Sequence, residues 1–290
     1  MKRLLIVALL LLSSCKAADS PQLSELTLAS GGFETLGHDV ARVSPMPARP
    51  VPAGSSVENI RLVAEGKAQA GFAAIDFCLL AAQGEQPFGR ALPLRALAVL
   101  PEDYVQVVVR ADSTITNFAA LSKKRVVVGP PMVANVTANR VIDATRIDVV
   151  RMELSTSDAS AALRSGDVAA IVHIGGLPSQ VVTDLGIPIR VLPLPIGVEE
   201  LTSRFGDIYV ARTIPAGTYQ STVSVETFGI PNLYLVREDL PDKAAYQLTQ
   251  LLFKARPQLD RRQAAAASPL PLHPGAVRFY QESKPFAGMP

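Results

Sequence analysis

Residues 62–72, LVAEGKAQAGF, close a helical pattern at a glycine and then begin an apolar strand. Residues 162–172, ALRSGDVAAIV, repeat this arrangement one hundred positions later. Gly66 and Gly166 each suit the left-handed position that follows the last turn of a helix. The chain therefore carries one unit, a helix followed by a glycine and a strand, at matching places in its two halves.

A capping pattern precedes each of these helices. Residues 55–58, SSVE, stand before the first helix, and residues 155–158, STSD, stand more loosely before the second. A hydroxyl residue followed three positions later by an acidic residue satisfies free N–H groups at a helix start. Coincidence between two common helix–strand joints is the alternative. We favour a repeated unit, which predicts two lobes of similar architecture.

Short β-branched or alanine-rich runs alternate with helical patterns along the rest of the chain. Such alternation predicts parallel sheets covered by helices, which is an α/β fold. A turn over residues 101–103 is expected to separate two strands. The expected strands are 23–29, 70–75, 94–100, 105–110, 126–128, 149–152, 168–174, 189–192, 223–225 and 233–236, and the expected helices are 57–64, 136–144, 157–164 and 240–255.

Length and composition agree with two globular lobes. The chain has 290 residues, of which 48% are hydrophobic and 19% are charged. Its formal net charge is +2, from 28 basic and 26 acidic residues. Without Lys2 and Arg3 the two signs balance, since 28 minus 2 leaves 26 basic residues. This balance, without basic runs, argues against nucleic acid as a partner.

The N-terminus predicts export and a lipid anchor. Lys2 and Arg3 precede an apolar run over residues 4–12 that is too short to span a bilayer and fits a secretory signal. Residues 12–15, LSSC, resemble a bacterial lipobox, in which the peptidase cuts before the cysteine and Cys15 carries the lipid. An ordinary signal peptide with an incidental cysteine is the alternative. The expected segments are a signal peptide, 1–14, and an anchor with its tether, 15–22.

No pattern of catalytic or metal-binding residues is present. The two cysteines are Cys15 and Cys78, and the second is expected to be a buried small hydrophobic residue. His38, His173 and His273 are far apart and form no metal-ligand spacing. No serine has nucleophile-elbow spacing. We therefore expect no enzyme activity, no metal and no cofactor.

Two α/β lobes imply a cleft between them, where ligands bind outside the carboxyl ends of the strands. Three loops at such ends lead into helices, whose N-termini attract carboxylate or phosphate groups. Ser55 or Ser56 could cap its helix and also donate to a ligand anion, and capping alone is an equal alternative. The loops expected at the cleft are 30–36, 54–59, 76, 129–137 and 173–177.

Several segments, in order along the chain, resemble one family. They are residues 53–62 (AGSSVENIRL), 65–68 (EGKA), 121–130 (LSKKRVVVGP), 214–219 (IPAGTY) and 273–276 (HPGA). Together the chain resembles, over about residues 24–284, the solute receptors of the TAXI class. These are the extracytoplasmic binding subunits of one branch of tripartite ATP-independent periplasmic (TRAP) transporters.

The resemblance implies a two-lobed fold of the type II periplasmic-binding-protein kind, with a hinge and an interlobe cleft. Lobe 1 would comprise residues 23–108 and 228–290, and lobe 2 residues 109–227, with crossings near 105–111 and 223–233. The protein would close on a small organic anion and deliver it to membrane permease subunits. The implied ligand-binding residues are Ser30, Gly31, Gly32, Phe33, Ser55, Ser56, Asn59, Asp76, Gly129 and Asn135.

Two loops depart from the family pattern. Residues 31–35, GGFET, lack the two tyrosines of the family's Gly-Gly-x-Tyr-Tyr segment, and residues 132–135, MVAN, replace its Gly-Ser-Gly-Thr loop. An amino acid or dicarboxylate is the family's ligand, and a larger or more apolar carboxylate fits the altered loop better. The expected location is periplasmic or extracytoplasmic, with the lipid on a bacterial membrane.

A ligand-sensing or scaffold lipoprotein that is not coupled to transport is the alternative function. Lys16 after the lipid site favours the outer membrane by the usual sorting pattern of Gram-negative lipoproteins. That location suits delivery to an inner-membrane permease less well.

Overall fold

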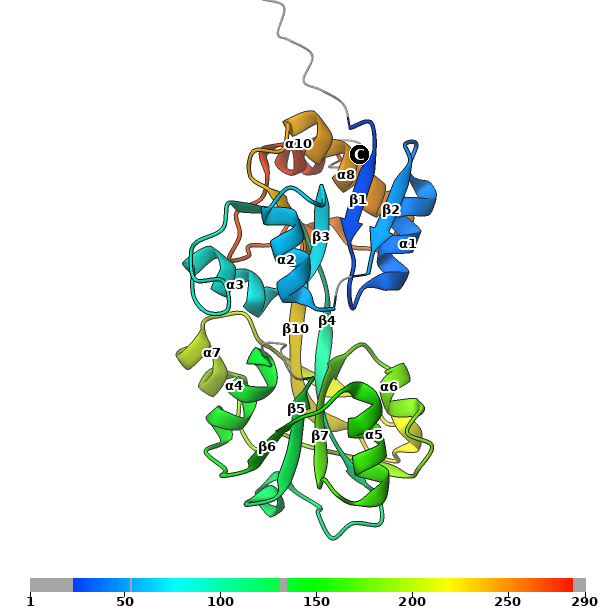
Figure 1. The fold of residues 1–290 in the computed structure, drawn as a ribbon, viewed down its shortest axis with the longest axis vertical. Coiled ribbons are helices and arrows are strands. Elements are labelled where there is room, and N and C mark those ends of the chain that lie inside the picture. The colour runs from blue at the N-terminus through cyan, green and yellow to red at the C-terminus, as the bar shows by residue number, and fades with distance from the viewer. Residues whose placement is uncertain (1–22, 53, 131–134, 284–290) are drawn as a thin grey trace, which may run out of the picture.

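The computed structural model describes residues 23–52, 54–130 and 135–283. The predicted signal peptide, Cys15 and the tether lie outside these residues. Figure 1 shows two groups of helices and strands, one above the other, with two long strands running between them. We call the upper group lobe 1 and the lower group lobe 2.

Lobe 1 is built on three short parallel strands. Strand β1 (Leu26–Ala29) lies between β2 (Ala48–Val51) and β3 (Ala70–Ala74) and pairs parallel with both. Its helices are α1 (Glu34–Val43), α2 (Ser56–Ala64), α3 (Ile75–Gln83), α8 (Asp242–Ala255), α9 (Arg261–Ala264) and α10 (Pro274–Glu282).

Lobe 2 repeats the parallel arrangement. Strand β5 (Arg125–Gly129) pairs parallel with β6 (Val150–Glu153) and β7 (Ala170–Gly175). Its other elements are α4 (Val136–Thr145), α5 (Thr156–Ser165), α6 (Gln180–Thr183), α7 (Val198–Phe205), β8 (Ile189–Leu192), β9 (Val210–Ile214) and short 3₁₀ turns at Phe118–Leu121 and Thr218–Gln220.

Two long antiparallel strands, β4 (Leu94–Arg110) and β10 (Val225–Arg237), belong to both lobes. In lobe 1, β10 lies between β3 and β4. In lobe 2, β4 pairs with β7 and β8, and β10 pairs with β9. Their partners change near residues 100–104 and 229–232, and the residue bounds predicted for the lobes stay a prediction.

The predicted turn over residues 101–103 is wrong, because β4 runs through it without a break. Of the predicted strand 223–225 only Val225 is in a strand, and that strand, β10, continues through the predicted strand 233–236. Pro101, in the predicted turn, and Pro231 both lie at the register shift between Ile230 and Asn232, where the ladder is irregular. Proline is tolerated at such a place because no regular ladder hydrogen bond needs its missing N–H.

The repeated helix–glycine–strand unit is confirmed. The Ser55 hydroxyl accepts a hydrogen bond from the Glu58 N–H at the start of α2, and the Ser155 hydroxyl accepts one from the Asp158 N–H at the start of α5. Gly66 and Gly166, after the two helices, have φ values of +71° and +86°. The sequence thus places both helices by local chemistry at their two ends.

The hydrophobic core has two main parts. One part packs β1, β3, β4 and β10 against α8 and α10, and includes Phe72 stacked on Tyr234 with ring centroids 4.8 Å apart. The other continues through both lobes, from Ile60 on α2 to Val141 on α4. Within residues 23–283, apart from the undescribed positions, no helix combines the length and apolar character needed to cross a bilayer.

Helix α10 lies very close to α8 at Gly275. A Cβ atom at this position would overlap the Asp242 carbonyl oxygen and lie 2.9 Å from the Ala245 Cβ. We predict that Gly275→Ala lowers the free energy of unfolding by about 1–3 kcal/mol through overpacking. Denaturant unfolding measures this, with Gly176→Ala as the control because a Cβ there meets nothing within 4 Å. Equal losses in the two variants would contradict the tight contact.

Candidate functional site

A cavity of about 380 Å³ lies between the two lobes, within the size range of small-molecule sites. Lobe 1 contributes the loop after β1 and the start of α2, and lobe 2 contributes the end of β5, the start of α4 and part of β7. Asp103 also lines the cavity, at the place where β4 passes from lobe 1 to lobe 2. The predicted ligand residues that the structure brings together here are Gly31, Gly32, Phe33, Ser55, Ser56, Gly129 and Asn135.

The other three predicted residues, Ser30, Asn59 and Asp76, are buried and do not line the cavity. Asn59 fixes the glycine loop from behind. Its amide donates to the carbonyl oxygens of Gly31 (2.9 Å) and Phe72 (2.8 Å), and its oxygen accepts from the Gly31 N–H (3.0 Å). The structure therefore shows a positioning role for Asn59, and ligand contact by any of the three stays a prediction.

Both serines at the start of α2 have structural partners. Ser55 caps the helix, and the Ser56 hydroxyl accepts a hydrogen bond from the Ala74 N–H (3.1 Å), which joins α2 to the end of β3. Each hydroxyl accepts in these bonds, so each retains its own hydrogen to donate. The first turn of a helix also has backbone N–H groups without a partner inside the helix. The start of α2 is thus a set of donors at the cavity.

The start of α4 faces the same cavity from lobe 2. Asn135 precedes this helix, and its side chain accepts no capping hydrogen bond; its amide nitrogen donates to the Pro130 carbonyl oxygen (3.2 Å) and the Glu153 carboxylate (3.3 Å). The adjoining Gly129 has a φ of +136°, which other residues rarely adopt, and a Cβ there would overlap the Asn135 side chain. The first turn of α4 is therefore left uncapped by this side chain.

A buried contact joins the lobes beside the cavity. The Thr137 hydroxyl on α4 donates a hydrogen bond to the Asp76 carboxylate on α3, which also accepts from the Phe77 N–H (2.8 Å). Asp76 is 0% exposed. Burial raises the pKa of Asp76, while Thr137 and the charge of Arg140 lower it by less. Cys78, on the same helix, is buried as predicted, and its pKa is raised by burial.

The two residues with titratable side chains among those described at the cavity, His173 and Asp103, were missing from the predicted set. The His173 Nε2 lies 2.7 Å from the Ser179 hydroxyl, and burial lowers the pKa of His173 to about 4, so the ring is neutral at pH 7. Burial raises the pKa of Asp103, and a hydrogen bond from the Asn232 amide opposes this. Sequence reasoning placed His173 in a cleft loop without a role, and it placed Asp103 in a turn.

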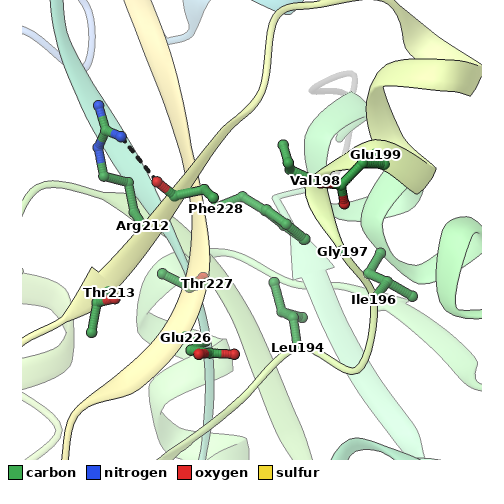
Figure 2. Close-up of a pocket in the computed structure, with 11 residues that line it drawn as sticks. Leu194, Ile196, Gly197, Val198, Glu199, Arg212, Thr213, Glu226, Thr227 and Phe228 are labelled. Atoms are coloured by element: carbon green, nitrogen blue, oxygen red, sulfur yellow. Dashed lines mark hydrogen bonds between the residues drawn. The ribbon is translucent and has the colours of Figure 1, made fainter.

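A second hollow, of about 330 Å³, lies in lobe 2 beside β9 and β10 (Figure 2). Figure 2 shows Arg212 on one side of it, opposite the segment that carries Val198 and Glu199. Arg212 forms an ion pair with Glu102. Burial would raise the pKa of Glu102, but the hydrogen bond from Arg212 brings it below the ordinary value. This hollow contains none of the predicted ligand residues, so the interlobe cavity is the better candidate site.

Comparison with known proteins gives a family and a fold. The model of a family described as NMT1-like matches residues 44–283. Among solved structures, the alkanesulfonate-binding protein SsuA from Xanthomonas axonopodis pv. citri, bound to MOPS, is 16% identical with a TM-score of 0.53, covering 92% of this chain and 86% of its own.

Two further structures have the same fold. A TctC solute binding protein from Polaromonas is 20% identical with a TM-score of 0.51, covering 92% of this chain and 97% of its own. An ancestral arginine-binding protein bound to arginine is 13% identical with a TM-score of 0.50, covering 90% and 99%. These likenesses confirm the predicted two-lobed α/β fold of periplasmic solute-binding proteins. The TAXI assignment stays a prediction.

The burial of the Asp76 carboxyl group predicts a pH effect on stability. Because the folded-state pKa of Asp76 lies above its ordinary value of 3.8, the folded protein binds this proton more tightly, and stability falls as the pH rises from 3.8 through the raised pKa. We predict that Asp76→Asn removes this part of the pH dependence. Denaturant unfolding between about pH 4 and pH 8 measures it. The exposed Asp158→Asn is the control, and an Asp76→Asn slope equal to that of the wild type would refute the assignment.

Proposed function

The chain belongs to the NMT1-like family, and from this premise we propose that it is an extracytoplasmic solute-binding receptor for a TRAP-type transporter. It captures a small organic anion by closing its two lobes. The observation that carries this proposal is the cavity between the lobes, at which α2 and α4 both begin.

The beginnings of these helices supply the attraction for an anion. Each helix N-terminus carries a partial positive charge together with free N–H donors, and a negative group near it gains typically about 0.3–1 kcal/mol. One helix lies in each lobe, and the hydroxyls of Ser55 and Ser56 add donors on the lobe 1 side. An anion between them would contact both lobes at once.

The rest of the cavity favours an apolar portion in the solute. Phe33 and Phe77 line it from lobe 1, and Val128, Val136 and Ile174 line it from lobe 2. Burial of apolar ligand surface against such side chains stabilises a complex in proportion to the area removed from water. A carboxylate with an aliphatic or aromatic body suits this lining.

Lobe closure is the proposed mechanism. Strands β4 and β10 form the connection that bends, and a solute that contacts both lobes shifts the population toward the closed form. The Asp76–Thr137 bond forms only when α3 and α4 meet, so it belongs to the closed form. The solute is bound and released unchanged, and membrane permease subunits bind the closed receptor.

The test is a thermal-shift screen against amino acids, dicarboxylates, keto acids and monocarboxylates. A ligand at about 100 times its Kd adds about 2.7 kcal/mol of stability, which raises Tm visibly. We predict that Thr156→Trp, which fills the cavity, abolishes the shift. Ser157→Trp, on the next residue and outside the lining, should retain it. No shift with any carboxylate would favour the sensor or scaffold function instead.

The lipid anchor is part of the proposal and concerns residues outside the described part of the chain. We predict that Cys15→Ala releases the protein from the membrane fraction, because the thiol that carries the lipid is lost. Fractionation and immunoblotting measure this, with Cys78→Ala as the control since that thiol is buried. Membrane association that is unchanged in Cys15→Ala would count against lipidation.

A further inference from the structure

The charges around the interlobe cavity are unusual for a protein that binds an anion. Among the described residues that line it, none is lysine or arginine, and the one carboxylate is Asp103. The imidazole of His173 is neutral at pH 7 because burial disfavours its charged form. The proposed anion therefore has no cationic side chain to pair with among the described lining residues, and a carboxylate, that of Asp103, lies where β4 passes from lobe 1 to lobe 2, which we call the cavity floor.

One oxygen of the Asp103 carboxylate is available to bind a ligand. Asp103 lies on β4 and pairs with Ile230 of β10, at the place where the two long strands pass from one lobe to the other. Its Oδ2 accepts a hydrogen bond from the Asn232 amide (3.2 Å), and its Oδ1 has no partner among the described residues. An ionised carboxylate accepts several hydrogen bonds, so this oxygen can accept from a ligand.

Asn232, behind Asp103, has a second unused acceptor. Its amide nitrogen donates both to the Pro101 carbonyl oxygen (3.1 Å) and to Asp103, and this fixes which end of the amide faces them. The Asn232 Oδ1 is buried and has no hydrogen-bond partner in the described part of the chain. A buried acceptor without a donor is costly, but Asn232 does not line the cavity, so Asp103 provides the free acceptor that a ligand can reach.

The nearby arginines have other partners. Arg212, on β9, forms its ion pair with Glu102 and also donates to the Ala211 carbonyl oxygen (2.9 Å). Arg140 lies over the Phe205 ring, 4.9 Å from its centre, and donates to the Tyr209 hydroxyl (3.4 Å). Neither arginine lines the cavity.

The geometry points to a zwitterionic solute, whose ammonium group binds Asp103 on the floor while its carboxylate lies at the starts of α2 and α4. This inference rests on the proposed function and narrows its ligand to an amino acid or another amino carboxylate. A dicarboxylate would bring a second negative charge toward Asp103, and no described residue of the cavity lining is a lysine or arginine that could compensate it. Asp103 is then the residue that selects for the amine.

The experiment compares each amino acid with the same acid lacking the amine. The pairs are L-leucine with isocaproate, L-phenylalanine with hydrocinnamate, and L-glutamate with glutarate, measured by thermal shift and by calorimetry. We expect at least one amino acid to bind at least about tenfold more tightly than its partner, as a charge-assisted hydrogen bond gives. In Asp103→Asn this ratio should fall to within about threefold.

Asp103→Asn should fold, because the amide oxygen of an asparagine can accept the hydrogen bond from the Asn232 amide nitrogen. Asp158→Asn, which removes a carboxylate near the start of α5 that does not line the cavity, should keep the wild-type ratio. The wild-type ratio is itself a test that needs no variant.

The two proposals fail in different ways. Carboxylates that bind the wild type equally well with and without the amine would overturn the zwitterion and leave the receptor function standing. An undiminished ratio in folded Asp103→Asn would overturn the role of Asp103. Absence of binding by every member of all three pairs would count against both proposals.

Discussion

The antiparallel pairing of β4 with β10 is the interaction on which the rest of the structure depends. In lobe 1 this pair completes the sheet begun by β1 and β3, and in lobe 2 the same two strands pair with β7, β8 and β9. At the crossing, Pro101 and Pro231 lie at a shift in register, so the pair has fewer regular bonds there than on either side. The connection is therefore continuous and also locally weak, as a hinge requires.

Buried polar groups then give the cavity its shape. Asn59 holds the Gly31 backbone by two hydrogen bonds and bonds the Phe72 carbonyl oxygen by a third, and Thr137 meets Asp76 where α4 approaches α3. Neither Asn59 nor Asp76 reaches the cavity, yet each fixes a segment that does. Because a buried polar group left without its partner is costly, these contacts hold the walls in one arrangement.

Features that depend on local chemistry could be predicted from the sequence. Ser55, Ser155 and the glycines after α2 and α5 act within one turn of the residues they stabilise, and all were placed correctly. Seven predicted residues reach the cavity because loops at strand ends meet there in any such sheet. Asp103 could not be predicted, because Pro101-Glu102-Asp103 has the composition of a turn. Only its pairing with Ile230, distant in sequence, makes it part of a strand and places it on the cavity floor.

The position of β10 has a consequence for the order in which the chain can fold. This strand lies in the middle of the lobe 1 sheet, between β3 and β4, and α8 and α10, which cover that sheet, follow it. A ribosome releases it only after all of lobe 2 has been made. Until then β3 and β4 have no strand between them, and lobe 1 stays unfinished while the first half of the chain is already synthesised. In the sequence, the elements of lobe 2 lie between the two parts of lobe 1, and their synthesis sets the delay before the lobe 1 sheet can be completed.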